Sequence, residues 1–182
     1  MTSSLSTTSY ALLGLLVFDS ETSQHGLTGY ELKQRADRTL RFYWVSPAMS
    51  QIYTELERLS GLDFVDATDD TTGKRTTRRF RITATGREAL TTWLHTSAHD
   101  FPILKHPIAL RLMLGSLMGP GEVESMLDDY VSAVAARREE LEAVREMLGD
   151  DEAVAYPARV ADWGLAYYDA EVEIVEKLRR TL

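Results

Sequence analysis

The spacing of apolar residues between Ser46 and Gly61 constrains the fold of this chain more than any other feature of its sequence. The apolar side chains recur at i, i+4 and i+7, which places them on one face of a helix: Ile52, Leu56 and Leu59. Ser46 is a favoured N-cap, Pro47 suits the first helical position, and Gly61 ends the segment. The opposite face is then polar, with Tyr53 on its flank and these residues outward: Pro47, Ser50, Gln51, Thr54, Glu57 and Arg58.

Two further helices are predicted before this one. Residues 8–18 are almost wholly apolar after a Ser/Thr stretch that can supply the N-cap, which favours a helix buried on most sides. A turn follows from Ser20 to Leu27. Thr28 and Glu31 then have the spacing of a capping box, so we expect a second helix to about Thr39. Its inner face would carry Leu32 and Ala36.

Residues 62–98 have the signals of a strand hairpin followed by a fourth helix. Leu62 to Thr68 and Thr76 to Ile82 are predicted strands, and Asp69 to Gly73 has turn chemistry. The returning, outer strand is basic, because five cations fall within eight residues: Lys74, Arg75, Arg78, Arg79 and Arg81. Thr85 to Glu88 fits another capping box, so a helix should run toward about Ala98. Its inward residues would be Leu90, Trp93 and Leu94. Three helices, a hairpin and a helix form the order of a winged helix-turn-helix.

The second half of the chain is predicted to be helical. His99 to His106 looks like a connector, so we divide the chain into a DNA-binding domain at 1–99 and a helical domain at 100–182. A short apolar helix at 108–117 is followed by the breaker Gly119 to Gly121 and then by two long helices. Their apolar stripes are Val123, Met126, Tyr130, Val134, Leu141, Val144 and Leu148, and then Val160, Trp163, Tyr167, Ile174 and Leu178.

These two stripes carry more apolar surface than the segment can cover by itself, so a second copy of the chain is implied. The expected fold is therefore mainly α with a two-stranded β-wing, an N-terminal winged helix-turn-helix and a C-terminal helical dimerisation domain. The candidate dimerisation residues are Tyr130, Val160, Trp163, Tyr167, Ile174 and Leu178. Aromatic residues of this half, including Tyr156 and Tyr168, serve either the dimer core or a small-molecule effector site, and both readings stay open.

Charge and composition exclude several classes of protein. The net charge is −8, but residues 1–99 hold 11 Lys/Arg and 11 Asp/Glu, whereas residues 100–182 hold 9 and 17. The acidic excess therefore lies in the second half, and a basic patch survives in the first. Cysteine is absent, which excludes disulfides and cysteine nucleophiles. The apolar runs are too short for a membrane span and no signal peptide is recognised, so we expect a cytoplasmic protein with no membrane partner.

The first half resembles the PadR family of bacterial transcriptional regulators, in the form with a longer C-terminal arm. Four pieces match in order and spacing over about residues 8–95: Tyr10 to Leu16, Gly29 to Leu32, Ile52 to Leu59 with Gly61 and Leu62, and Arg79 to Thr83 with Gly86. The resemblance implies a winged helix-turn-helix dimer that represses a promoter and is often released by a small, frequently aromatic molecule. The predicted helix that corresponds to the family's recognition helix, here called the reading helix, departs from the family pattern at its start, Ala48 to Gln51, so the resemblance does not imply which bases it contacts.

DNA binding would use two kinds of contact. Ser50, Gln51 and Thr54 have the reach and exposure to bond base edges in a major groove. Lys33, Tyr53, Lys74 and Arg75 would mostly hold phosphates, the last three being positions that match the family's recognition helix and wing. Two copies of the domain at 1–99, related by a two-fold axis, would bind double-stranded DNA at an inverted-repeat operator.

Two other functions remain in competition with the regulator. A helical interaction adaptor, whose winged helix does not bind DNA, is favoured by the zero net charge of residues 1–99. A zinc-dependent sensor or hydrolase is the third, because His95 and His99 lie four apart with Asp100 and His106 nearby. No nucleophile elbow and no phosphate loop occur, so we expect neither an enzyme nor a cofactor.

Overall fold

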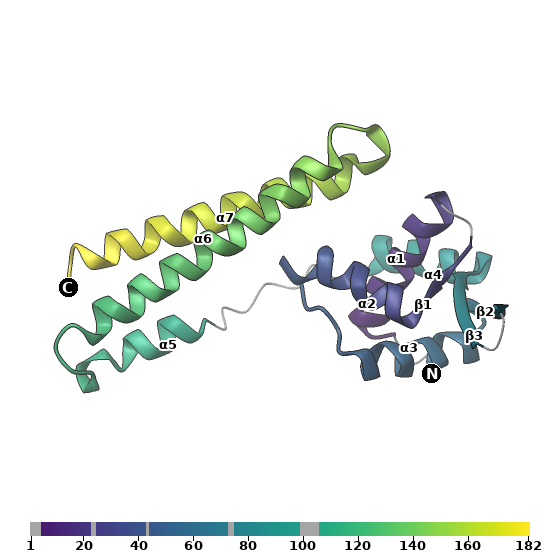
Figure 1. Ribbon diagram of the computed structural model, residues 1–182, viewed down its shortest axis with the longest axis horizontal. Coiled ribbons are helices and arrows are strands. Elements are labelled where there is room, and N and C mark those ends of the chain that lie inside the picture. The colour runs from purple at the N-terminus through teal and green to yellow at the C-terminus, as the bar shows by residue number, and fades with distance from the viewer. Residues whose placement is uncertain (1–4, 23–24, 43, 73–74, 99–105) are drawn as a thin grey trace. The chain divides into compact units, whose positions relative to one another are not determined.

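The computed structural model describes residues 5–22, 25–42, 44–72, 75–98 and 106–182, and the chain divides into two compact units, Met1–Asp100 and Phe101–Leu182. We call the first unit the head and the second the arm (Figure 1). The head contains α1 Thr7–Thr22, β1 Leu27–Thr28, α2 Gly29–Arg38, a 3-10 turn at Leu40–Phe42, α3 Met49–Gly61, β2 Val65–Thr72, β3 Arg75–Ile82 and α4 Ala84–Thr96. The arm contains α5 Pro107–Met113, a 3-10 turn at Gly115–Leu117, α6 Glu122–Leu148, a 3-10 turn at Glu152–Val154 and α7 Ala155–Arg179.

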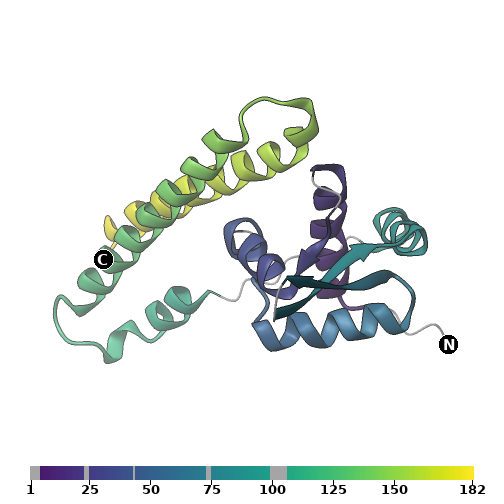
Figure 2. The ribbon, with the colours of Figure 1, turned by 45° about the vertical axis from the view of Figure 1, so that its right-hand side comes forward.

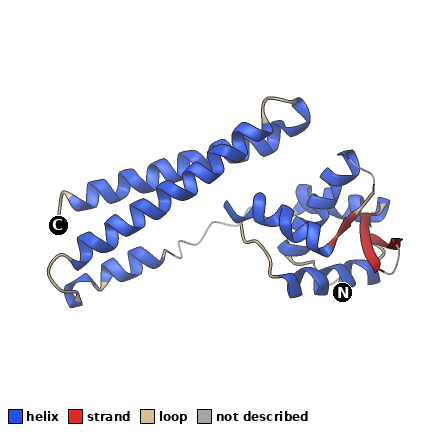
Figure 3. Cartoon of the chain, viewed as in Figure 1, coloured by secondary structure: helices blue, strands red, loops and turns tan. Residues whose placement is uncertain are grey.

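The described strands all belong to the head, as Figure 3 shows in red. Helix α1 contacts α2, α3, α4 and β3, which explains why its sequence is apolar on nearly all sides. The predicted inner faces of α2 and α3 are confirmed as core, and five side chains are 0% exposed: Leu32, Ala36, Ile52, Leu56 and Leu59. Burial of each of these leucines contributes on the order of 2 kcal/mol. The core therefore fixes which face of each helix points outward.

The sheet of the head differs from the predicted two-stranded hairpin. Its strand order is β1-β3-β2, all antiparallel, so the basic strand β3 is central rather than outer. The added strand β1 is only two residues long and pairs Leu27 with Phe80. The predicted turn at 69–73 is also wrong in extent, because Asp69 pairs with Arg78 inside the ladder. Opposite charges directly across two strands stabilise such pairs, which accounts for the longer hairpin.

Of the caps predicted for α2, α3 and α4, the first is correct and the other two are wrong. The capping box of α2 is present: Thr28 Oγ1 accepts from the Glu31 N–H at 3.1 Å, and the Thr28 N–H donates to Glu31 Oε2 at 2.8 Å. Helix α3 begins at Met49, not at Pro47, and α4 is capped by Thr83 rather than Thr85. Thr83 Oγ1 accepts from the Gly86 N–H at 3.0 Å.

Ser46, Pro47 and Leu94 also differ from their predicted roles. The Ser46 hydroxyl, predicted as a cap, donates instead to Asp37 Oδ1 at 2.6 Å, and Pro47 is buried rather than outward. On α4, Trp93 stacks on Tyr10 with ring centroids 4.6 Å apart, whereas Leu94 is 63% exposed and not inward as predicted. Adjacent helical residues diverge by about 100°, so only one of this pair can face α1.

The arm is built on α6 and α7, which run side by side in both ribbon views (Figure 2). The predicted stripe of α6 lies inward, with Met126, Val134 and Leu141 buried. Helix α7 meets it with small residues instead of its predicted stripe, namely Ala158, Ala161 and Gly164. A Cβ added at Gly164 would lie 2.6 Å from Leu141 Cδ2. Glycine therefore permits the close approach of the two helices. None of the described helices has the length and hydrophobicity of a membrane span.

A buried polar cluster around Glu171 joins the three helices of the arm. Glu171 is 8% exposed and its Oε2 accepts from the Tyr130 hydroxyl at 2.7 Å and from His106 Nε2 at 3.0 Å. His106 Nδ1 accepts the Ala109 N–H at 3.2 Å, so the Nε2 of the neutral ring carries the donated proton. Burial acts to raise the pKa of Glu171, but hydrogen bonds from Tyr130, His106 and Tyr167 together lower that pKa below its ordinary value.

This cluster makes the stability of the arm depend on pH. Glu171→Gln should lower the free energy of unfolding at pH 7 by about 1–3 kcal/mol, because an ionised acceptor is lost from a buried site. A carboxyl with a depressed folded-state pKa stabilises above its unfolded pKa, and this contribution is lost as pH falls through the folded value, below 4.5. Thermal unfolding of both proteins by circular dichroism from pH 7 to pH 3 should therefore show the difference shrinking.

The exposed residue Glu173 on the same helix supplies the matched control, and Glu173→Gln should change the unfolding temperature little at any pH. A Glu171→Gln deficit that stayed constant down to pH 3 would contradict the charged role of this carboxylate.

Candidate nucleic-acid interface

The outward face of α3 gathers the side chains that the sequence predicts as base-reading. Ser50, Gln51 and Thr54 are exposed and line one shallow pocket of about 380 Å³. Ser6 and Thr8, from the start of α1, line the same pocket. These two residues were predicted only as part of a helix-capping stretch, and the signal that could have found them is the cluster of hydroxyl side chains at the N-terminus. The pocket thus presents a polar surface along the first turns of α3.

Two of these side chains already make hydrogen bonds within the head. Gln51 Oε1 accepts the Ala48 N–H at 3.0 Å and so caps α3, while its amide N–H groups stay available as donors. The Thr54 hydroxyl donates to the Ser50 carbonyl at 3.0 Å, which leaves its lone pairs and methyl group for an outside partner. An amide donor suits the acceptor edges of purines, and a threonine methyl suits the methyl of thymine.

Tyr53 lies on the flank of α3, where it packs against the start of α2. A Cβ added at Gly29, the first residue of α2, would come within 2.7 Å of the Tyr53 ring. Tyr53 remains 47% exposed, so the same side chain fixes α3 on α2 and faces solvent. Tyr30, which the sequence analysis missed, is 59% exposed on the first turn of α2. A large aromatic residue on an otherwise polar helix face was the signal for it.

Lys33 is less available to phosphate than predicted, because its charge is compensated inside the head. Its Nζ forms an ion pair with Asp37 and lies 3.2 Å from the Ser46 hydroxyl. Hydrogen bonds from Lys33 and Ser46 lower the pKa of Asp37, which therefore stays ionised at neutral pH. A phosphate contact by Lys33 stays a prediction.

The wing is basic in sequence but carries acids opposite its cations. Arg78 and Arg81 are both exposed, and their Cα partners on β2 are Asp69 and Asp66. Arg75 pairs with Thr72 through the backbone at the end of the ladder, and Lys74 lies outside the described residues. The short strand β1 pairs with β3 at Phe80 and Arg79, so among the basic positions of β3 this pairing covers Arg79 alone.

The candidate dimerisation residues fall into two groups. Trp163 is 76% exposed, and four neighbours on the same side of α7 are also partly or largely exposed: Val160, Tyr167, Ile174 and Leu178. The Tyr130 hydroxyl donates to Glu171 inside the arm, and the Tyr167 hydroxyl also bonds this carboxylate, although Tyr167 is 49% exposed. We call the exposed set Tyr156, Val160, Trp163, Tyr167, Ile174 and Leu178 the α7 stripe.

The histidines that suggested a zinc site are not gathered in the part of the chain that the structure describes. His95 Nδ1 lies 2.7 Å from the Thr91 carbonyl of its own helix, and His106 belongs to the Glu171 cluster. His99 and Asp100 lie outside the described residues. Within the described ranges, no group of three or more His, Asp or Glu side chains has the geometry of a metal site.

Comparison with known proteins places this geometry in context. Residues 20–92 match the model of the Transcriptional regulator PadR-like family. No curated protein matches the chain by sequence at a significant level. Among solved structures, PadR of Bacillus subtilis in complex with operator DNA is 22% identical with a TM-score of 0.80, covering 95% of this chain and 97% of that chain. The same protein in complex with p-coumaric acid is 21% identical with a TM-score of 0.70, covering 93% and 92%.

Two other solved structures have the same fold. A PadR-like transcriptional regulator from Bacillus cereus is 20% identical with a TM-score of 0.76, covering 97% of this chain and 96% of that chain. The virulence activator AphA of Vibrio cholerae is 16% identical with a TM-score of 0.66, covering 93% and 94%. At these identities the likeness establishes the fold, and the family match covers α2, α3 and the wing, the elements that form the candidate interface. Over residues 20–92 the chain is therefore similar to the PadR-like family of transcriptional regulators.

Proposed function

We propose that this regulator is a repressor that binds an inverted-repeat operator as a homodimer and is released by a small aromatic molecule. The observation that carries the proposal is the division of α3 into two faces. Ile52, Leu56 and Leu59 are fully buried, while Ser50, Gln51 and Thr54 stand together on the exposed side. A helix held in this way fits the major groove with short donors and acceptors toward the base edges.

The α7 stripe supports the homodimer. Its side chains lie off the face that packs on α6, so a second copy of the arm would cover them without unpacking the first. A two-fold dimer is the commonest symmetric assembly and would place two α3 helices about one helical turn of DNA, roughly 34–36 Å, apart. The operator should therefore be an inverted repeat.

Two observations support release by an aromatic molecule: the tyrosines around Glu171 in the arm, and a similar solved structure that contains an aromatic ligand. PadR of Bacillus subtilis has been solved both with operator DNA and with p-coumaric acid. In the present chain, Tyr130 and Tyr167 bond the carboxylate of Glu171, and the Tyr168 ring lies against the Tyr167 ring with centroids 5.8 Å apart, so aromatic faces and a hydrogen-bond acceptor occur together. Both features suit a phenolic ligand.

The function is tested with DNA from upstream of the protein's own gene. A gel shift at two salt concentrations should give a specific complex that weakens steeply with salt, because phosphate contacts release counterions. A reporter driven by the same DNA should fall when the protein is supplied. The compensated charge of the wing favours the interaction adaptor as the competing function, and absence of any shift would support it. A rising reporter would make the chain an activator, the role that AphA is named for.

The dimer interface is tested at Trp163. Trp163→Ala should weaken dimerisation by about 2–4 kcal/mol, the scale of a central aromatic anchor, and weaken operator binding with it. The helicity of the arm should not change, because Trp163 is 76% exposed within one chain. Light scattering across a dilution series measures the dimer, with the exposed, off-stripe variant Glu173→Ala as control. A tight Trp163→Ala dimer would place the interface elsewhere.

Base reading is tested at Gln51. Gln51→Ala should cost about 1–3 kcal/mol on the operator and hardly change binding to random duplex, because only the operator offers the matched base edge. Loss of the cap on Ala48 lowers head stability but not the ratio of the two affinities, so the ratio is the readout. Glu57→Gln, about one turn beyond Thr54, should tighten binding to random duplex by relieving phosphate repulsion. Equal weakening of both duplexes by Gln51→Ala would exclude α3 as the reading element.

The wing is tested by charge removal at its tip. Lys74→Ala and Arg75→Ala should lower affinity for operator and random duplex alike, and each should reduce the slope of log affinity against log salt by about 0.9. Arg87→Ala removes a cation from α4, where Arg87 bonds Ser20, and should leave the slope unchanged. Wing variants with the wild-type slope would place the hairpin tip away from the DNA.

A further inference from the structure

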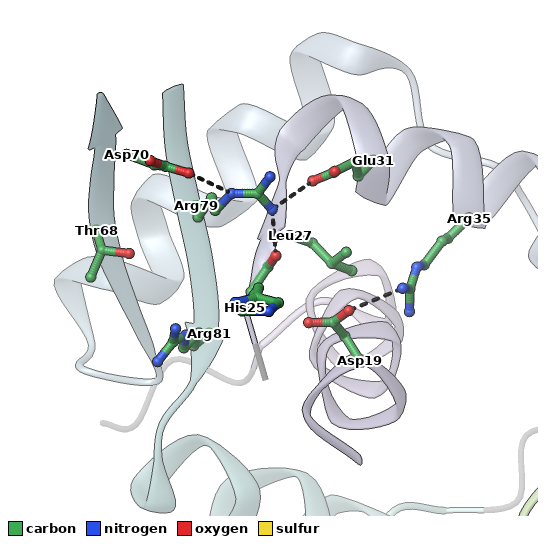
Figure 4. Close-up of a pocket in the computed structure, with 10 residues that line it drawn as sticks. Asp19, His25, Leu27, Glu31, Arg35, Thr68, Asp70, Arg79 and Arg81 are labelled. Carbon is green, nitrogen blue, oxygen red and sulfur yellow. Dashed lines mark hydrogen bonds and ion pairs between the residues drawn. The ribbon is translucent and has the colours of Figure 1, made fainter. Parts of the chain in front are cut away.

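Arg79 on the central strand β3 has a set of partners that the DNA-binding role does not explain. Figure 4 shows its guanidinium between Asp70 of β2 and Glu31 of α2, which approach it from opposite sides. Nε donates to Asp70 Oδ2 at 3.4 Å, and Nη1 donates to the Gly26 carbonyl at 2.8 Å and to Glu31 Oε2 at 3.3 Å. The side chain is only 27% exposed.

These acceptors belong to three separate segments of the head. Asp70 lies in the hairpin, Gly26 precedes β1, and Glu31 lies in the first turn of α2. Gly26 and Glu31 are 53 and 48 residues away from Arg79 in the sequence. One planar fork of N–H donors can satisfy acceptors in such fixed directions, whereas a lysine ammonium acts as a point charge without this geometry. Arg79 thus connects the wing to the helix-turn-helix.

The connection continues to the reading helix. The Glu31 oxygen that accepts from Arg79 also accepts the Thr28 N–H, so Arg79 acts on the capping box that begins α2. The first residue of α2, Gly29, is the one that packs against Tyr53 of α3. Displacement of the α2 start would therefore move the flank of α3 as well as the loop before β1.

We propose that Arg79 is a positioning residue that holds the wing at a fixed place against α2 and α3, so that the hairpin and the reading helix reach DNA together. This inference rests on the proposed DNA-binding function. The charge of Arg79 is compensated by Glu31 and Asp70, so it supplies orientation and makes no phosphate contact of its own. Its role in this respect differs from that expected of Lys74 and Arg75.

The charge of Glu31 provides a test, because simple electrostatics and the positioning of Arg79 predict opposite changes in operator affinity. Glu31→Gln removes a negative charge near the interface, so simple electrostatics would tighten DNA binding. Glutamine still supports a capping box, so the start of α2 is retained. If Glu31 acts by holding Arg79, the same variant should instead weaken operator binding, by about fivefold or more. Burial acts to raise the pKa of Glu31, but hydrogen bonds with Thr28 and the charges of Arg79 and Arg35 hold that pKa below its ordinary value. The carboxylate is therefore ionised at assay pH.

The experiment compares the full-length wild type with Arg79→Lys, Arg79→Gln and Glu31→Gln on operator and random duplex at four salt concentrations. Circular dichroism at the assay temperature establishes that each variant is folded, so a changed affinity is not a loss of folded protein. We expect operator affinity to fall at least tenfold for both Arg79 variants, with the wild-type salt slope, because no phosphate contact is removed.

Three results would overturn the inference. The first is full operator affinity for Arg79→Lys. The second is a salt slope reduced by about 0.9 in Arg79→Gln, which would make Arg79 a phosphate contact. The third is tighter operator binding by Glu31→Gln. Failure of the proposed function itself is distinguishable, because the wild-type protein would then bind neither duplex specifically in the same assay. Specific wild-type binding with unaffected variants removes only the role of Arg79.

Discussion

The burial of Ile52, Leu56 and Leu59 is the constraint on which the functional surface depends. All three are fully buried in the core that α1 and α2 complete. Since a helix rotates by about 100° per residue, this burial fixes the direction of every other α3 side chain. Ser50, Gln51 and Thr54 are therefore exposed together on one surface, and Tyr53 is held on Gly29 at the start of α2. A polar face on a firmly packed helix is what the reading of DNA in a groove requires.

Charge in the head is used for orientation as much as for attraction. Arg79 is shared by Glu31 and Asp70, Lys33 is paired with Asp37, and Asp19 pairs with Arg35 at 3.0 Å. In a domain whose residues 1–99 have zero net charge, part of the basic side chains therefore hold elements of the head in place. The arm divides its residues in a comparable way. Small residues and Glu171 hold α7 on α6, while the α7 stripe, the surface that we propose for a second copy, remains exposed.

Local patterns in the sequence predicted much of this architecture. The stripe of α3, the capping box at Thr28 and the order of helices and hairpin were confirmed, because each depends on residues within a few positions of one another. The errors involve partners distant in sequence. The Ser46 hydroxyl bonds Asp37 instead of capping α3. Strand β1 forms by pairing Leu27 with Phe80, and Arg79 bonds Glu31, which lies 48 residues away in the sequence. Similarly, the inward face of α7 depends on Gly164 meeting Leu141.

The most direct test of the account is a hydroxyl-radical footprint of the full-length protein on DNA from upstream of its own gene. A two-fold dimer that reads with α3 predicts protection at two half-sites of an inverted repeat, with centres about one helical turn, roughly 10 base pairs, apart. Protection of a single half-site, or of unrelated positions without symmetry, would contradict the dimeric reading head. Absence of protection at low salt would contradict the reading face of α3 itself.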